Sequence, residues 1–332
     1  MRTPGVSAGF PERHWYRLSW LSIALAPAAL VFGLVALARR AAYRAGILAV
    51  DRLRVPVVVI GNLVVGGTGK TPLALWLVAA LRARGFRPGV LARGYRAAGS
   101  SPRAVPPGGD PAAYGDESLL VAERSGVPVW VGRDRAAAGR ALLAAHPECN
   151  VLVCDDGLQH YRLARDFEIA VEDERGFGNG LLLPAGPLRE LPSRAVDVVV
   201  VNGGPARPGA LAMALRADRC YRLGEPDRAV DLDALRRVRL HAVAGIGHPG
   251  RFFATLEALG LAFTPHAFPD HHAYSPHDLE YPGCEAILMT EKDAVKCRAF
   301  GRDDLYALRV EASVDPRLAD LIALRLHGLE AA

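Results

Sequence analysis

An apolar segment runs directly into a glycine-rich turn near residue 60, and this junction constrains the fold more than any other part of the chain. Residues 55–60 are apolar and mostly β-branched, which is typical of a buried strand. Glycines then recur up to Gly69, and apolar residues return at helical spacing from Leu73 to Leu81. A strand, a glycine turn and a helix in this order predict an anion site at the helix N-terminus.

The turn itself reads Val64-Val65-Gly66-Gly67-Thr68-Gly69-Lys70-Thr71. Glycines allow consecutive backbone amides to point inward and cradle a polyphosphate. We expect Lys70 to reach the β- and γ-phosphates and the Thr71 hydroxyl to bind Mg²⁺. Val64 stands where the usual pattern has its first glycine, although Gly66, Gly67 and Gly69 can supply the flexibility. Residues 64–71 therefore predict a P-loop for ATP and Mg²⁺, the alternative being an ordinary glycine turn.

A second apolar segment, residues 150–154, ends in the carboxylates of Asp155 and Asp156. On its own, an apolar strand followed by two aspartates is a common way for a strand to end in a turn. Downstream of a P-loop it matches the pattern in which acidic residues at a strand end hold Mg²⁺ or its waters. We therefore interpret Asp155 and Asp156 as candidate metal ligands.

Two further carboxylates follow a stretch rich in Gly, Pro, Ser and Ala, residues 97–113, which predicts a mobile surface loop. Asp116 and Glu117 then open a helical pattern. Carboxylates in a first turn often only complement the helix dipole, and the sequence favours that interpretation. For Asp116, the alternative is acceptance of a proton from a hydroxyl substrate.

Residues 18–38 carry no charge, and a 21-residue helix is about 31 Å long, enough to cross a bilayer core. Aromatic residues lie before the segment, and Arg39, Arg40 and Arg44 lie after it. This pattern predicts a membrane anchor whose basic flank keeps the rest of the chain cytoplasmic. The alternative is a buried or half-inserted helix broken near Pro27.

Apolar strands alternate with helical segments along the rest of the chain, which predicts an α/β fold with a mainly parallel sheet of the P-loop NTPase type. We expect three parts: an N-terminal membrane anchor at 1–45, a P-loop core at 46–204, and a smaller C-terminal α/β lobe at 205–332. Five scattered cysteines favour a reduced environment, and a net charge of +5 does not demand nucleic acid.

Five motifs in order resemble the tetraacyldisaccharide 4′-kinase family, the lipid A 4′-kinases of Gram-negative bacteria. They are the segments 65–72, 115–117, 155–160, 183–190 and 289–296, which together span nearly the whole chain. The resemblance implies ATP- and Mg²⁺-dependent phosphorylation of the 4′-hydroxyl of tetraacyldisaccharide 1-phosphate. The product would be lipid IVA, formed at the cytoplasmic face of the inner membrane.

The resemblance also implies roles for individual residues. Asp116 would be the base, His271 its support and Lys70 a third catalytic group, with the two lobes closing on the substrate. It also implies that the metal is held by Thr71, Asp155, Asp156 and Glu190, and that the substrate is bound by Arg93, Glu117, Asn179 and Arg189. The expected partners are the lipid disaccharide and inner-membrane lipid, without nucleic acid or a protein partner.

Two alternatives remain open at this stage. The chain can also be interpreted as a membrane-tethered P-loop switch that acts on a protein partner. Residues 290–293, Thr-Glu-Lys-Asp, predict either a loop that recognises the nucleotide base or a surface turn with paired charges.

Overall fold

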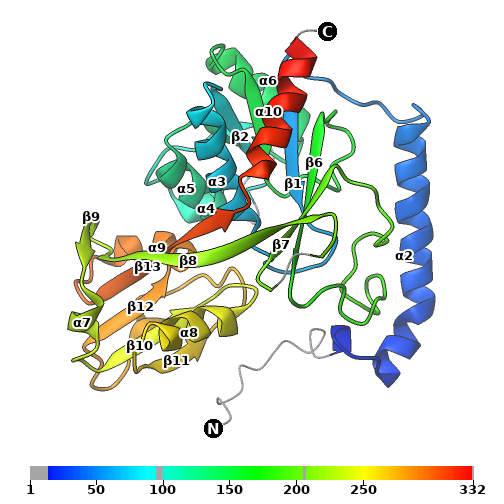
Figure 1. The fold of residues 1–332 in the computed structure, drawn as a ribbon. Helices are drawn as coiled ribbons and strands as arrows, with labels where there is room; N and C mark the ends of the chain where they lie inside the picture. The colour runs from blue at the N-terminus through cyan, green and yellow to red at the C-terminus, as the bar shows by residue number, and fades with distance from the viewer. Residues whose placement is uncertain (1–13, 95–98, 100, 205–206, 331–332) are drawn as a thin grey trace.

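The apolar segment ahead of the glycine turn forms the central strand of the first half of the molecule (Figure 1). This strand, β1 (Val57–Gly61), is buried along its length and pairs in parallel with β5 (Val151–Cys154) and β6 (Phe167–Asp173). Parallel neighbours bring their carboxyl ends to one edge of a sheet. The glycine turn after β1 and Asp155 after β5 therefore meet at that edge.

The computed structural model describes residues 14–94, 99, 101–204 and 207–330. Parts of three predicted segments fall outside the described residues. They are the first 13 residues of the anchor, positions 97, 98 and 100 of the predicted loop, and residues 205–206 at the predicted lobe boundary.

More parallel strands extend the sheet, and helices cover both of its faces. These elements are β2 (Pro88–Ala92), β4 (Val129–Val131), β7 (Val198–Asn202), α3 (Lys70–Ala83), α5 (Asp116–Ser125) and α6 (Arg135–Ala145). Leu73, Leu77 and Leu81 of α3 are fully buried at the spacing predicted for one helix face. The expected mainly parallel α/β core is confirmed.

Two long strands carry the sheet from the first half into the second. The first residues of β8 (Ala210–Arg222) pair in parallel with β7, and the rest of β8 runs antiparallel to β13 (Leu305–Val314). Figure 1 shows this pair as a ribbon that joins the two halves. The lobes are therefore linked by backbone hydrogen bonds as well as by chain connections.

The second half is a smaller α/β unit on the same sheet. Its elements are β9 (Glu225–Val230), α7 (Leu232–Leu235), β10 (Leu240–Ala244), α8 (Pro249–Ala258), β11 (Thr264–Ala267), η1 (Pro276–Leu279), β12 (Ala286–Thr290), α9 (Glu291–Cys297) and η2 (Arg298–Phe300). With the edge strand β3 (Arg103–Ala104), the described residues form 13 strands, ordered β11-β10-β12-β13-β8-β7-β6-β1-β5-β2-β4-β3, with β9 beside β8. The predicted second α/β lobe is present.

The last helix, α10 (Arg317–Glu330), returns to the first half. Its side chains Leu318, Ile322 and Leu326 are at most 1% exposed and belong to the same apolar cluster as α3. The division of the chain at residue 205 stays a prediction. The structure adds that α10, although it follows the second lobe in sequence, packs on the first.

The predicted anchor forms α2 (Trp20–Arg44), a 25-residue helix that stands beside the rest of the molecule (Figure 1). It begins at the N-cap Ser19, contains Pro27 and extends past the predicted end at residue 38. Only 17% of its most apolar 18-residue window is buried, so it is not the core helix of a soluble domain. By length and composition, α2 is able to cross a membrane.

Two local predictions need correction. The predicted loop 97–113 contains β3 and a short helix, α4 (Pro111–Tyr114), begun by the Asp110 side chain as N-cap. Residues 290–293 do not form a surface turn: Thr290 ends β12 and caps α9, and the Asp293 side chain is fully buried. In each case tertiary contacts order a short polar segment that has little periodicity of its own.

Candidate active site

The glycine turn has a backbone that only glycine adopts readily. Gly66 has φ = 108° and Gly69, the N-cap of α3, has φ = 96°. A Cβ at Gly69 would also lie 2.5 Å from Asn202 Nδ2, which donates a hydrogen bond to the Thr68 carbonyl. The turn is therefore held in shape both by its own glycines and by β7.

Val64 and Val65, the first two residues of the predicted P-loop, contact a neighbouring segment and hold the turn in place instead of facing outward. Val64 is buried and forms a bridge to Leu188, and the Val65 amide donates to the Pro187 carbonyl at 2.9 Å. Val64 thus replaces glycine at a position that packs against another segment. Phosphate binding is expected from the amides of residues 66–71, at the N-terminus of α3.

The two aspartates at the end of β5 lie against the P-loop. Thr71 Oγ1 donates to Asp155 Oδ2 at 3.2 Å, while Asp156 Oδ1 lies 3.4 Å from Lys70 Nζ and 3.3 Å from Arg189 Nη1. Burial raises the pKa of Asp155 to about 7, and the Glu117 charge adds to this effect. Burial also raises the pKa of Asp156, but Lys70 and Arg189 outweigh it and lower the value to about 2.

This pair of carboxylates fits a magnesium site. Asp155 Oδ1 is buried and, within the part of the chain that the structure describes, has no hydrogen-bond partner. A hard cation such as Mg²⁺ would provide the positively charged partner that this oxygen lacks. No group of three or more His, Cys, Asp or Glu side chains converges among the described residues. Mg²⁺ shared between one or two carboxylates and the nucleotide phosphates requires no such group.

Glu190, the fourth predicted metal ligand, is engaged in another network. Its Oε1 accepts from Arg194 Nη1 at 2.7 Å and from Gln159 Nε2 at 3.0 Å, and its Oε2 accepts from the Tyr161 hydroxyl. The structure therefore brings together Thr71, Asp155 and Asp156 but places Glu190 in a buried ion pair.

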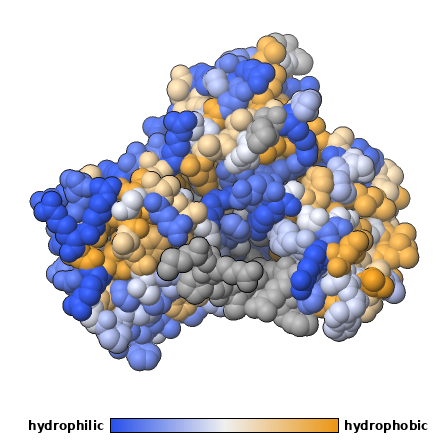
Figure 2. Space-filling model, turned by 60° about the horizontal axis from the view of Figure 1, so that its bottom comes forward, coloured by the Kyte–Doolittle hydropathy of each residue, from blue (hydrophilic) through white to orange (hydrophobic). Residues whose placement is uncertain are grey.

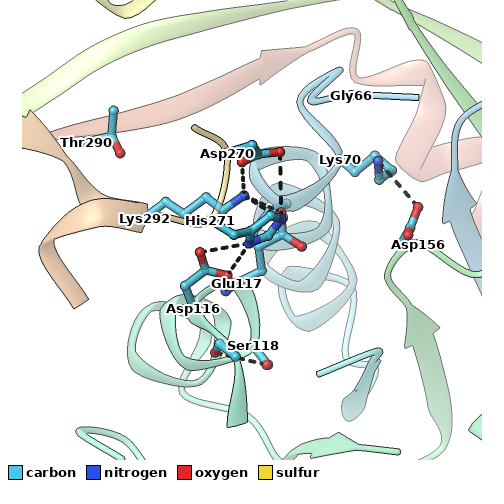
Figure 3. Close-up of polar contacts among 12 residues, drawn as sticks. Gly66, Lys70, Asp116, Glu117, Ser118, Asp156, Asp270, His271, Thr290 and Lys292 are labelled. Carbon is cyan, nitrogen blue, oxygen red and sulfur yellow. Dashed lines mark hydrogen bonds and ion pairs between the residues drawn. The ribbon is translucent and has the colours of Figure 1, made fainter. Parts of the chain in front are cut away.

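The predicted base and its support are in contact (Figure 3). Asp116 is the buried first residue of α5, and His271 Nδ1 lies 3.0 Å from both of its carboxylate oxygens. Burial raises the pKa of Asp116, but the hydrogen bond from His271 and the charges of Lys292 and Lys296 outweigh it and lower the pKa. The contact that was expected to need lobe closure is already made here.

His271 reaches Asp116 from an unusual backbone conformation. Its φ is 59°, and its amide donates to the Gly245 carbonyl at 3.2 Å. A left-handed non-glycine residue is found where the surrounding structure holds it, often at functional sites.

The four predicted substrate residues divide into two groups. Arg93 and Arg189 line a cavity of about 620 Å³ that also receives Arg39 from α2, Arg133 and Arg135. Glu117 instead pairs with Lys292 at 2.9 Å, and Asn179 donates to the Ala185 carbonyl and to Ser22 Oγ of α2. Asn179 thus ties α2 to the loop beside it.

A second cavity of about 710 Å³ lies between the lobes. The P-loop residues Gly67, Gly69, Lys70 and Thr71 form part of its wall. Apolar side chains from both lobes form another part, including Leu75, Leu120, Leu215, Ile246 and Phe252. Sequence reasoning missed the apolar wall because its members come from separate elements with no shared motif.

A P-loop beside paired aspartates, with an Asp–His pair next to the residues that line the same cavity, defines a nucleotide-dependent phosphotransferase of the P-loop class. The family model described as tetraacyldisaccharide-1-P 4′-kinase matches residues 21–327. The chain belongs to this family.

Individual relatives agree with the family match. The tetraacyldisaccharide 4′-kinase of Dechloromonas aromatica is 50% identical, covering 97% of each chain, and that of Methylobacillus flagellatus is 46% identical, covering 96% of each. A crystal structure of LpxK from Aquifex aeolicus in complex with ATP superposes with a TM-score of 0.79 at 28% identity, covering 92% of this chain and 99% of that one.

Proposed function

We propose that this chain transfers the γ-phosphoryl group of ATP to the 4′-hydroxyl of tetraacyldisaccharide 1-phosphate and so forms lipid IVA. The observation that carries this proposal is the shared cavity between the lobes, whose wall includes Gly67 and Lys70 of the P-loop together with Glu117 and Lys292 beside the Asp116–His271 pair. In Figure 3, Lys70 of α3 reaches Asp156, while Asp116 of α5 reaches His271 on the loop after β11.

The residues around this cavity take separate roles. The amides of residues 66–71 and Lys70 hold the triphosphate, and Asp116 accepts the proton of the attacking hydroxyl. Thr71, Asp155 and Asp156 would hold Mg²⁺, which supplies positive charge near the phosphates when it is bound. The lowered pKa of Asp116 keeps its carboxylate ionised, as a proton acceptor must be.

The arginine-lined cavity supports binding of an anionic lipid headgroup. Arg93 and Arg189 line it, and Asp156 connects it to Lys70 through the ion pair described above. Guanidinium groups bind phosphate oxygens with two parallel hydrogen bonds. Arg39 brings this cavity to α2, which supports delivery of the substrate from the membrane.

The charges at the ends of α2 support a cytoplasmic active site at the inner membrane. Arg39, Arg40 and Arg44 occupy the end of the helix from which the chain enters the catalytic body. Excess Arg and Lys beside a membrane helix favour the cytoplasmic side.

The test is incubation of the purified, detergent-solubilised protein with γ-labelled ATP, Mg²⁺ and tetraacyldisaccharide 1-phosphate. We expect label on the lipid, and we expect Lys70→Ala to lower the rate by about 10³-fold or more because the β- and γ-phosphates lose their ammonium contact. Arg228→Ala, which removes an exposed ion pair on β9, is the matched control and should keep the wild-type rate.

Consumption of ATP without label on the lipid would contradict the kinase proposal. That result would favour the switch protein that the P-loop alone also allows.

A further inference from the structure

One lysine joins the two lobes directly behind the Asp116–His271 pair. Lys292, on α9, has its Nζ 2.9 Å from Glu117 Oε1, 3.1 Å from Asp270 Oδ1 and 3.3 Å from His271 Nε2 (Figure 3). An ammonium group has three N–H donors and no acceptor. Each of the three donors therefore has its own acceptor, and the lysine is fixed in position.

These contacts determine which nitrogen of His271 carries the proton. Nδ1 lies 3.0 Å from both oxygens of the Asp116 carboxylate, which only accepts, so Nδ1 must donate. Nε2 faces the ammonium of Lys292, which only donates, so Nε2 must accept. Both requirements are met by a neutral imidazole protonated at Nδ1.

We propose that Lys292 is a positioning residue that fixes His271 as the neutral Nδ1–H tautomer, so that Asp116 alone receives the proton of the substrate hydroxyl. This inference rests on the proposed function. As the hydroxyl oxygen bonds to the γ-phosphorus, the bond from that phosphorus to the leaving oxygen of ADP breaks. The hydroxyl proton passes to Asp116 and afterwards to water. His271 cannot take it, because its lone pair faces Lys292.

Other charged groups surround the histidine and bear on its protonation. Asp116 contacts it from α5, Glu117 of the same helix pairs with Lys292, and Asp270 Oδ2 lies 3.7 Å from Nε2 on the loop of the histidine itself. Lys296 of α9 lies 3.8 Å from Asp116 and pairs with Asp293 at 2.8 Å. The carboxylates favour a positively charged, doubly protonated imidazole. The ammonium group of Lys292 disfavours that state because it lies next to Nε2.

The test compares Lys292→Met with Arg298→Met in the full-length enzyme. Arg298 also joins the second lobe to α5, through Glu123 at 2.7 and 3.0 Å, but it does not contact the Asp–His pair. We expect Lys292→Met to lower kcat by about 10–100-fold at neutral pH. Its acid limb in kcat should move to higher pH, because loss of the Lys292 charge raises the pKa of Asp116. We expect Arg298→Met to keep the wild-type pH profile even where its Tm falls.

Two further measurements keep the outcome independent of folding. In ¹⁵N-histidine spectra of the wild type, the resonances that disappear in His271→Gln should report a protonated Nδ1 and an unprotonated Nε2. Lys292→Arg, which keeps the positive charge, should restore the position of the acid limb. An imidazolium signal in the wild type, or an unshifted acid limb in active Lys292→Met, would overturn the inference. Failure of the wild type to label the lipid would instead overturn the proposed function.

Discussion

The environment of Asp116 sets a compromise between base strength and orientation. The carboxylate is buried at the start of α5 and accepts a hydrogen bond from His271, with Lys292 and Lys296 close by. These neighbours lower its pKa, which makes it a weaker base than a free aspartate. In exchange, it is ionised and aligned before the substrate arrives, which removes a reorganisation step from the reaction.

Asp116→Asn tests the proton-acceptor role. The amide has nearly the same shape but does not accept the hydroxyl proton, so we expect kcat to fall by about 10²–10⁴-fold. The dissociation constant for ATP, measured by equilibrium dialysis, should change little because Asp116 contacts His271 and not the P-loop. Equal kcat for the variant and the wild type would remove Asp116 as the base.

The pKa direction of Asp116 gives the sign of its pH dependence. Its folded pKa is below the ordinary value of 3.8, so the ionised Asp116 carboxylate stabilises the fold above that value. This contribution is lost as the pH falls below 3.8 through the folded pKa. We expect urea midpoints of wild type and Asp116→Asn to converge as the pH is lowered through this window and to differ most at neutral pH.

At the scale of single residues, sequence patterns found the groups that belong to local motifs. Lys70, Thr71, Asp155 and Asp156 lie in segments whose residue types and spacing follow from phosphate and metal chemistry. The structure brings these segments together. The role of His271 came only from the family resemblance. Lys292 belongs to the segment 290–293 that the sequence singles out. Its contacts with Glu117 and Asp270 were not predictable, because they join three segments that lie far apart in the sequence.

At the scale of elements, the strands easiest to predict were those formed by a continuous run of apolar residues. β1 and β5 are such strands and are buried on both faces. The connecting strand β8 reads ALAMALRADRCYR, with four alanines and three arginines, and only some of its residues are buried. Its β structure is imposed by pairing with β7 and β13, which sequence periodicity does not reveal.

The C-terminal helix offers a test of its packing on the first lobe. Leu318 of α10 is fully buried there, and we expect Leu318→Ala to lower the free energy of unfolding by about 2–5 kcal/mol. The matched control is Leu324→Ala on the same helix, where the side chain is 74% exposed and the expected change is about 0.5 kcal/mol or less. Equal losses in urea denaturation would contradict this docking.

At the scale of the whole molecule, α2 adds an exposed apolar surface to the catalytic body. Val31 and Leu34 on this helix are 60% and 59% exposed, although both are strongly apolar. Figure 2 shows orange, hydrophobic atoms on the right of the molecule, the side on which Figure 1 places α2. Such a surface is stable in lipid and unfavourable in water.

Charges on this surface should weaken membrane binding. An aspartate at the centre of a membrane helix costs about 2.5–3.5 kcal/mol, so Val31→Asp combined with Leu34→Asp should release most of the protein from vesicles of phosphatidylethanolamine and phosphatidylglycerol. Flotation of the vesicles measures the bound fraction. Leu324→Asp, an exposed leucine on α10, is the control and should float as the wild type does. Unchanged flotation of the double variant would exclude α2 as the anchor.

The shared sheet also determines whether the chain can be cut into working pieces. Separation near residue 205 would leave β7 without β8 and would remove α10 from the lobe whose core it fills. A bare sheet edge is a template for intermolecular strand pairing, and a missing helix exposes a broad apolar face. Fragments made at that point would aggregate before they could be recombined, so the kinase has to be synthesised and folded as one continuous polypeptide.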